Sequence, residues 1–208
     1  MKNIVLFASG SGSNVENIIH HFHDKPNVTI AGVLTNKRDA KVLDRCNKLK
    51  VNGLYFNRTA FYDTNCILNI LKSLQPDLIV LAGFLWKIPS NLIKNYPNKI
   101  VNIHPALLPK YGGKGMYGNH VHQAVKDNME TETGITIHYV NKNYDEGAII
   151  HQSRTEVSSK DSVEEIAKKV HALEYKHFPE VIEKLLNEKS SPNIALGDVD
   201  LSQGGVKQ

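Results

Sequence analysis

The stretch Ile4–Phe22 reads I-V-L-F-A-S-G-S-G-S-N-V-E-N-I-I-H-H-F, and it decides the class of fold. Its first five residues, Ile4–Ala8, form an unbroken apolar run, which is typical of a strand buried on both faces. Apolar side chains then recur with helical spacing over Val15–Phe22. A strand, a glycine-rich turn and a helix make the first part of a β-α-β unit, whose two strands run parallel.

The same alternation continues through the first half of the chain. Right-handed crossovers between parallel strands place the intervening helices on both faces of a sheet. We therefore predict an α/β fold, a doubly wound and mostly parallel sheet with helices on both faces. The predicted strands are Ile4–Ala8, Val28–Leu34, Leu54–Phe56, Leu78–Ala82 and Ile100–Ile103, and the predicted helices are Val15–Phe22, Ala40–Lys50, Phe61–Leu74 and Pro89–Asn95.

The later part of the chain predicts an antiparallel extension of this sheet. Gly134–Val140 alternates between apolar and polar residues, as a strand with one exposed face does. A D-E-G turn and a second run, Ala148–Ser153, complete the pattern of an antiparallel pair. A long helix then begins at Asp161, with Glu164 at the spacing of a capping box, and Pro179 is a candidate break within it.

Composition is that of an ordinary soluble protein. The chain has 208 residues, of which 41% are hydrophobic and 22% charged, and its formal net charge is +4. This mild positive charge favours anionic small molecules, whereas nucleic-acid binding needs a clustered basic stripe that the sequence lacks. We expect a catalytic domain over residues 1–189 and a loose C-terminal tail over residues 190–208.

The N-terminus and the cysteines indicate where the protein works. The apolar run after Met1 is too short for a signal peptide and ends in glycines, and no stretch reaches the length of a membrane span. Cys46 and Cys66 lack the spacing of a metal or redox site, which is typical of a reducing compartment. We therefore expect a cytoplasmic protein that binds neither membrane nor nucleic acid.

The turn Ser9–Asn14, S-G-S-G-S-N, is a candidate phosphate site. Glycines let backbone N–H groups approach an anion, and the helix N-terminus adds positive partial charge. A Walker loop would need a lysine that is absent here. A dinucleotide fingerprint would need a glycine where Val15 stands and an acidic residue where Asn36 and Lys37 stand. We therefore predict a phosphomonoester ligand, with a plain strand-to-helix turn as the alternative.

Asn102 and His104 end the last predicted parallel strand, on the same side of it, and Asp145 lies in the later D-E-G turn. Ligands in open α/β sheets bind beyond the carboxyl ends of the strands, where these side chains could converge. An amide N–H stabilises an oxyanion, and a carboxylate raises the pKa of a nearby imidazole. We predict a site for transfer of a carbonyl group; the alternative is that Asn102 caps the strand and His104 packs under the loop.

Together the motifs G-S-G-S-N, L-A-G-F, N-I-H-P-A-L-L-P-K-Y and D-E-G resemble the folate-dependent phosphoribosylglycinamide formyltransferases over about residues 2–187. The resemblance implies a Rossmann-like formyltransferase fold. It implies transfer of the formyl group of 10-formyltetrahydrofolate to the amine of 5'-phosphoribosylglycinamide, in de novo purine (IMP) biosynthesis, without a metal. It also implies a cis peptide bond between Leu108 and Pro109.

The resemblance implies roles for individual residues. Asn102 and protonated His104 would stabilise the oxyanion, and Asp145 would raise the pKa of His104. Glu174 would hold the ribose, and it also falls on an apolar helical stripe, where a carboxylate needs a partner. The implied acceptor-binding residues are Gly12, Ser13, Asn14 and Glu174, and the implied folate-binding residues are Leu85, Trp86, Lys87, Ile88, Asn102, Asn141, Asp145 and Arg58. Leu85-Trp86 replaces a Met-Arg pair that is frequent in the family, so the folate pocket is expected to differ in shape.

Some features leave alternatives open. A formyltetrahydrofolate hydrolase or a non-catalytic ribonucleotide-binding sensor would share these motifs; we expect the transferase because no regulatory domain precedes the first motif. The loop Gly112–Gly118 is either a flap over the site or surface slack, and His138 is either a support for the site or a satisfied polar residue. We expect no metal at His20–His23 or at the pair His120 and His122. A monomer and a homodimer both fit.

Overall fold

The computed structural model describes residues 1–188, so the expected tail over residues 190–208 lies outside the described part. The strands are β1 Lys2–Ala8, β2 Val28–Thr35, β3 Gly53–Tyr55, β4 Leu78–Leu81, β5 Ile100–His104, β6 Glu132–Tyr139 and β7 Ile149–Glu156. The helices are α1 Ser13–Phe22, α2 Val42–Leu49, α3 Arg58–Tyr62, α4 Cys66–Leu74, α5 Ser90–Asn95, α6 Asn119–Asp127 and α7 Val163–Glu188.

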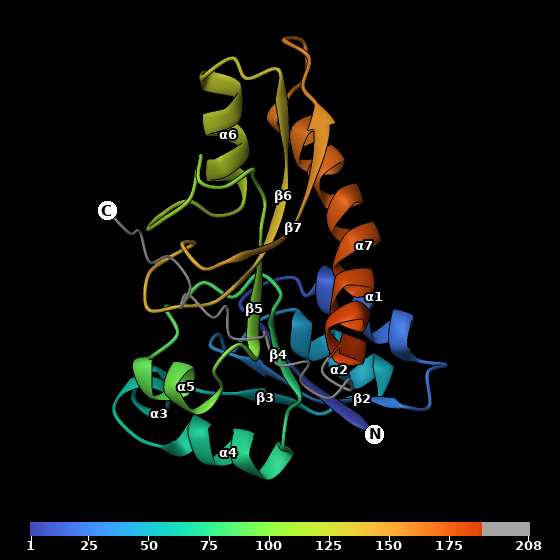
Figure 1. Cartoon of the computed structure of the whole chain (residues 1–208), viewed down its shortest axis with the longest axis vertical. Coiled ribbons are helices and arrows are strands. Elements are labelled where there is room, and N and C mark those ends of the chain that lie inside the picture. Colours follow the sequence, from blue (N-terminus) through green and yellow to red (C-terminus); the bar gives the residue numbers. More distant parts are fainter. Residues whose placement is uncertain (189–208) are drawn as a thin grey trace, which may run out of the picture.

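The strands form one seven-stranded sheet in the order β3-β2-β1-β4-β5-β6-β7 (Figure 1). The first five strands pair in parallel, and β6 and β7 are added antiparallel at one edge. The predicted α/β class, with a doubly wound parallel sheet and an antiparallel extension, is confirmed. The Leu108–Pro109 peptide bond is cis, as the resemblance implies.

Helices cover both faces of the sheet (Figure 1). One apolar core joins the sheet to α1, α2 and α7, and the other joins it to α3, α4 and α5. Strand β1 shows why its apolar run is unbroken: Ile4 and Leu6 belong to the first core, whereas Val5 and Phe7 belong to the second. All four side chains are fully buried, so each face of the strand contributes to a core.

Two helical predictions differ from the structure. The predicted helix Phe61–Leu74 is two helices, because Asn57 accepts a hydrogen bond from the backbone N–H of Ala60 and starts α3 early, and residues 63–65 then interrupt the helix. Helix α6 was not predicted at all. It begins after Gly118, and no side chain in the described part of the chain caps its first turn.

The prediction that one face of β6 is exposed is wrong. Both faces are buried, and Thr136 and His138 on the polar face are 0% and 2% exposed. The Thr136 hydroxyl accepts a hydrogen bond from the backbone N–H of Leu108 and donates one to the carbonyl of Ala106. The segment that follows β5 therefore takes the place of solvent on this face.

Helix α7 has its capping box one residue later than predicted. Ser162 Oγ accepts from the N–H of Glu165, and the Glu165 carboxylate accepts from the N–H of Ser162. Asp161 pairs with Lys169 instead, and the helix continues through Pro179. Within residues 1–188, no helix is both long enough and apolar enough to cross a membrane.

Candidate active site

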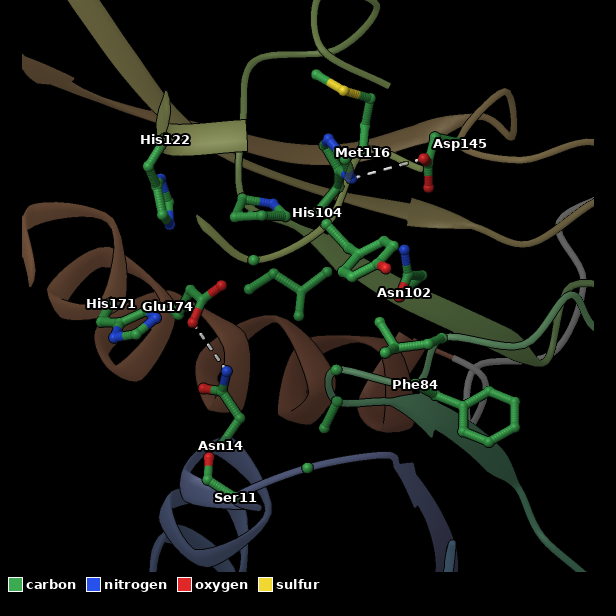
Figure 2. A pocket seen from close by; sticks show the side chains of 18 of the residues that line it. Ser11, Asn14, Phe84, Asn102, His104, Met116, His122, Asp145, His171 and Glu174 are labelled. Carbon is green, nitrogen blue, oxygen red and sulfur yellow. Dashed lines mark hydrogen bonds and ion pairs between the residues drawn. The ribbon is translucent and has the colours of Figure 1, made fainter. Parts of the chain in front are cut away.

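A cavity of about 630 Å³ opens at the carboxyl ends of β1, β4 and β5 (Figure 2). Its walls come from the turn before α1, the segment after β4, the end of β5, the glycine loop before α6, the turn between β6 and β7, and α7. This is the edge of an open α/β sheet at which ligands bind. The predicted site residues that line it are Gly12, Ser13, Asn14, Leu85, Asn102, His104, Asp145 and Glu174.

The glycine turn brings backbone donors to one end of the cavity. Gly12 precedes the first residue of α1 and has a left-handed backbone with φ of 74°. A Cβ atom at this position would lie 2.4 Å from Cγ2 of Val42, so only glycine fits without rearrangement. The first N–H groups of α1, including those of Ser13 and Asn14, have no acceptor within the helix and are available to an anion.

Glu174 lies at the same end of the cavity, on the buried stripe of α7. It is 7% exposed, and its carboxylate accepts a hydrogen bond of 2.9 Å from Nδ2 of Asn14. Burial raises the pKa of Glu174, and the Asn14 amide and the charge of His171 only partly oppose this. The Oδ1 atom of Asn14 is also buried and has no hydrogen-bond partner among residues 1–188.

Asn102 is oriented by His138, which lies opposite it in the β5–β6 pairing. Nδ1 of His138 lies 2.9 Å from the Tyr139 carbonyl, which can only accept, so Nδ1 carries the proton. While His138 is neutral, its Nε2 is the acceptor for Nδ2 of Asn102, at 3.1 Å. This bond places the amide nitrogen of Asn102 on the side of His138 and leaves its second N–H without an acceptor among residues 1–188. Of the two alternatives for His138, the structure favours support of the site.

His104 is almost completely buried at the end of β5. Its Nε2 donates to the carbonyl of Tyr111 at 2.7 Å, and its Nδ1 lies 3.6 Å from Oδ2 of Asp145. Burial lowers the pKa of His104 and outweighs the Asp145 charge and the Tyr111 carbonyl, which both raise it. Asp145 thus raises the pKa of His104, as predicted, but desolvation of the ring is the larger effect, so the pKa lies below its ordinary value.

Asp145 connects three parts of the site. Its Oδ2 accepts a hydrogen bond of 2.9 Å from the N–H of Gly113 in the glycine loop, and its Oδ1 lies 3.6 Å from Nε2 of His138. Burial alone would raise the pKa of Asp145, but His138, His104 and the Gly113 N–H together hold it below its usual value. The carboxylate therefore stays ionised beside two imidazole rings.

A protein family described as formyl transferase matches residues 2–182, a span that contains the sheet and every residue of this cavity. The chain belongs to the formyl transferase family.

This formyl transferase is similar to named enzymes over most of its length. It is 36% identical to the chloroplastic phosphoribosylglycinamide formyltransferase of Arabidopsis thaliana over 194 residues, which are 90% of this chain and 66% of the plant protein. It is 35% identical to the phosphoribosylglycinamide formyltransferase of Bacillus subtilis (strain 168) over 193 residues, which are 89% of this chain and 95% of that protein.

Solved structures agree with this membership. The phosphoribosylglycinamide formyltransferase from Anaplasma phagocytophilum superposes with a TM-score of 0.82 at 28% identity, covering 90% of this chain and 88% of that chain. The enzyme of the same name from Streptococcus pneumoniae TIGR4 gives a TM-score of 0.78 at 32% identity, covering 89% of this chain and 99% of that chain. The fold of this chain is therefore similar to that of solved phosphoribosylglycinamide formyltransferases.

Several predicted folate residues of this formyl transferase lie outside the cavity wall. Trp86 packs against the aromatic rings of Phe56, Phe61 and Tyr62. Ile88 is buried in the core. Arg58 stacks over Tyr62 at 4.7 Å. The remaining two are Lys87, whose Nζ lies 5.6 Å from the centre of the Tyr144 ring, and Asn141, whose Oδ1 accepts from the N–H of Asn143.

Other residues line the cavity without having been predicted. The glycine loop supplies several of them, so it forms part of the cavity wall. His122 of α6 and His171 of α7 are also there, and no sequence signal separated His122 from its neighbour His120. The unpredicted lining side chains are Ser11, Phe84, Lys114, Met116, Tyr117, His122, Tyr144 and His171. Among residues 1–188, no three His, Cys, Asp or Glu residues are grouped to hold a metal ion.

Proposed function

We propose that this formyl transferase is a phosphoribosylglycinamide formyltransferase. It transfers the formyl group of 10-formyltetrahydrofolate to the amine of 5'-phosphoribosylglycinamide, a step of de novo purine (IMP) biosynthesis. The observation that carries the proposal is one cavity that joins the anion-binding turn Gly12–Asn14 to Asn102, His104 and Asp145. The similarity to enzymes named for this activity supports it, and the chain covers 95% of the Bacillus subtilis protein.

The acceptor binds at the α1 end of the cavity. Gly12, Ser13 and Asn14 hold its phosphate with backbone N–H groups and side-chain donors. Glu174 binds the ribose hydroxyls, because within residues 1–188 its buried carboxylate has only the Asn14 amide as a hydrogen-bond partner. This arrangement directs the amine toward the end of β5.

Asn102 and His104 perform the chemistry. The acceptor amine attacks the formyl carbon, and the unused N–H of Asn102 donates to the oxyanion that forms. The new C–N bond remains, the bond from carbon to folate N10 breaks, and the proton lost by the amine reaches N10 by way of the His104–Asp145 pair. Burial lowers the pKa of His104, and Asp145, 3.6 Å away, stabilises the cation that His104 becomes in transit.

The folate donor binds on the side of Leu85, Asp145 and Asn102. Lys87 and Arg58 are exposed cations on aromatic rings, and Tyr144 under Lys87 lines the cavity, so they suit the anionic tail of the donor at the rim. We assign Trp86, Ile88 and Asn141 to the support of this rim. The donor is consumed as a co-substrate. We also propose a catalytic domain over residues 1–189 and a cytoplasmic location, the latter supported by the free thiols of Cys46 and Cys66.

Release of tetrahydrofolate from the 10-formyl donor, followed by absorbance, tests this proposal. We expect release only when phosphoribosylglycinamide is present. Release without the acceptor would favour a formyltetrahydrofolate hydrolase. Binding of the acceptor with no release in either case would favour a ribonucleotide-binding sensor.

A further inference from the structure

The backbone carbonyl of Tyr111 is the hydrogen-bond acceptor for the imidazole that the proposed reaction uses. Its oxygen lies 2.7 Å from Nε2 of His104. A carbonyl can only accept, so Nε2 carries the proton, and the lone pair of the neutral ring is on Nδ1. This Nδ1 atom lies 3.6 Å from Oδ2 of Asp145 (Figure 2). The position of one backbone carbonyl therefore sets which nitrogen of His104 can take up a proton.

The backbone around this carbonyl needs outside support. Tyr111 has a left-handed conformation, with φ of 57°, which is unfavourable for a bulky residue unless its surroundings hold it there. Two glycines follow, and a Cβ atom added to Gly113 would have nothing within 4 Å, so this part of the loop is loosely packed. The side chain of Tyr111 is therefore the means by which the rest of the fold can fix the carbonyl.

The hydroxyl group of Tyr111 is anchored to a carboxylate. It donates a hydrogen bond of 2.9 Å to Oε1 of Glu130, which lies between α6 and β6. The same oxygen accepts a hydrogen bond of 2.8 Å from Nζ of Lys110. Lys110 and Tyr111 lower the pKa of Glu130, whereas burial and Glu130 raise the pKa of Tyr111 to about 12. The bond therefore joins a protonated phenol to an ionised carboxylate, which is a strong pairing.

The anchor lies outside the cavity that holds His104. Glu130, Lys110 and Tyr111 line a separate, smaller pocket of about 220 Å³, and none of the three is part of the larger cavity wall. The ring of Tyr111 packs against a small apolar cluster, whose members are Val125, Val157 and Ile166. Glu130 can therefore act on the reaction only through Tyr111, and the ring keeps its packing when the hydroxyl is removed.

We infer that Glu130 is a positioning residue: its bond to the Tyr111 hydroxyl holds the Tyr111 carbonyl against Nε2 of His104. Nδ1 is thereby left facing Asp145 as the nitrogen that takes up the proton lost by the acceptor amine. This inference rests on the proposed function and extends it to a residue outside the cavity. Because Glu130 touches neither substrate, its loss lowers turnover and leaves the binding of both substrates intact.

Three substitutions test this role. Tyr111→Phe removes the hydroxyl, Glu130→Ala removes its acceptor, and Glu130→Gln keeps an acceptor oxygen. We expect Tyr111→Phe and Glu130→Ala to lower kcat about tenfold, as the loss of one hydrogen bond does, with both KM values within about twofold. We expect Glu130→Gln to stay within about threefold of the original kcat. Lys110→Met is the matched control, because it removes the other hydrogen bond of Glu130 and leaves Tyr111 intact, and its constants should not change.

NMR of the His104 ring nitrogens distinguishes positioning from a general loss of structure. ¹H–¹⁵N spectra at about pH 8 report which nitrogen carries the proton, because an imidazole whose pKa lies below about 6.5 is then neutral. We expect the proton on Nε2 in the original protein, in Glu130→Gln and in Lys110→Met. In Tyr111→Phe and Glu130→Ala we expect the two nitrogens to share it.

Tyr111→Phe decides the outcome, even if Glu130→Ala does not fold. An unchanged kcat in this variant, a proton that remains on Nε2, or a rise of both KM values in parallel would each overturn the inference. A Lys110→Met variant as slow as Tyr111→Phe would overturn it as well. If the original protein has no turnover, the proposed function fails instead, and the ring spectra still show whether Glu130 sets the tautomer of His104.

Discussion

Nδ1 of His104 lies 3.6 Å from Oδ2 of Asp145. Burial lowers the pKa of this imidazole, whereas the charge of Asp145 raises it. Burial is the larger influence, so the pKa of His104 lies below its ordinary value. The buried position that brings the imidazole to the formyl carbon therefore also favours its neutral form. The neighbouring carboxylate limits this effect and is ready to stabilise a proton that arrives during the reaction.

Asp145→Asn tests this balance. The amide keeps the shape of the side chain, and asparagine tolerates the left-handed backbone at this position, where φ is 54°. Because the Asp145 charge raises the pKa of His104, we expect its removal to lower that pKa further. NMR titration of the His104 ring measures both values. We expect turnover to fall by about 10²-fold or more with a smaller change in acceptor KM. A higher pKa of His104 in the variant, or unchanged turnover, would contradict the role of Asp145.

His122 makes stability depend on pH. In the unfolded chain a histidine binds its proton below about pH 6.5, whereas in the fold the pKa of His122 is about 4. The unfolded state therefore binds more protons between these values, so stability is complete above about pH 6.5 and falls as the pH decreases toward 4. We expect this residue to account for a loss of about 2–3 kcal/mol at pH 4.5 relative to pH 7.

Urea unfolding at the two pH values, for the original protein and for His122→Asn, measures this contribution. The loss of stability on acidification should be smaller in the variant by that amount. An identical loss in both proteins would show that His122 is already charged in the fold or exchanges with solvent.

Among the elements, α7 depends on a capping box that the sequence places one residue too early. Asp161 with Glu164 and Ser162 with Glu165 have the same spacing, and only the fold shows that Ser162 and Glu165 exchange both bonds. We expect Ser162→Ala to lower the free energy of unfolding by about 1 kcal/mol. The exposed Glu164→Gln should change it by about 0.5 kcal/mol or less. Urea denaturation measures both effects. A larger loss of stability in Glu164→Gln than in Ser162→Ala would indicate that Asp161 and Glu164 form the capping box instead.

The turn before α1 depends on the backbone of Gly12. We expect Gly12→Ala to cost about 2 kcal/mol or more of stability, because φ is 74° and the added Cβ would lie 2.4 Å from Cγ2 of Val42. Acceptor binding should weaken with it, since the shifted turn misplaces the first N–H groups of α1. Gly10→Ala is the matched control for stability, because nothing lies within 4 Å of its added Cβ. Equal thermal stability of the two variants would contradict the requirement for glycine at position 12.

The helices and strands also show which parts of the fold could be predicted from sequence patterns. Strand β1 is predictable because both of its faces meet apolar cores, so its apolar run is unbroken. Helix α6 was missed because it follows a glycine loop and has no side-chain cap, the signal by which a helix start is recognised. The polar face of β6 was taken as exposed because a hydroxyl or an imidazole in sequence does not reveal whether its partner is water or, as for Thr136, a backbone group.

In the whole molecule, the site draws on segments far apart in the chain. Asn102 and His104 were predictable because they share one strand end, and Asp145 because it lies in the turn that follows the next strand. His122 was not, since only the packing of α6 beside α7 turns it, and not His120, into the cavity. The pKa of His104 was also beyond the sequence, because it depends on how much water the complete fold removes.

The central claim is that one cavity binds a phosphorylated amine and that a formyl group is transferred to this amine there. Transfer from a donor carrying a ¹³C-labelled formyl group, followed by NMR in the presence of phosphoribosylglycinamide, tests it most directly. We predict that the label appears as a formamide carbon on the acceptor, in step with tetrahydrofolate. Label that appears as free formate, or that stays on the donor, would contradict the claim.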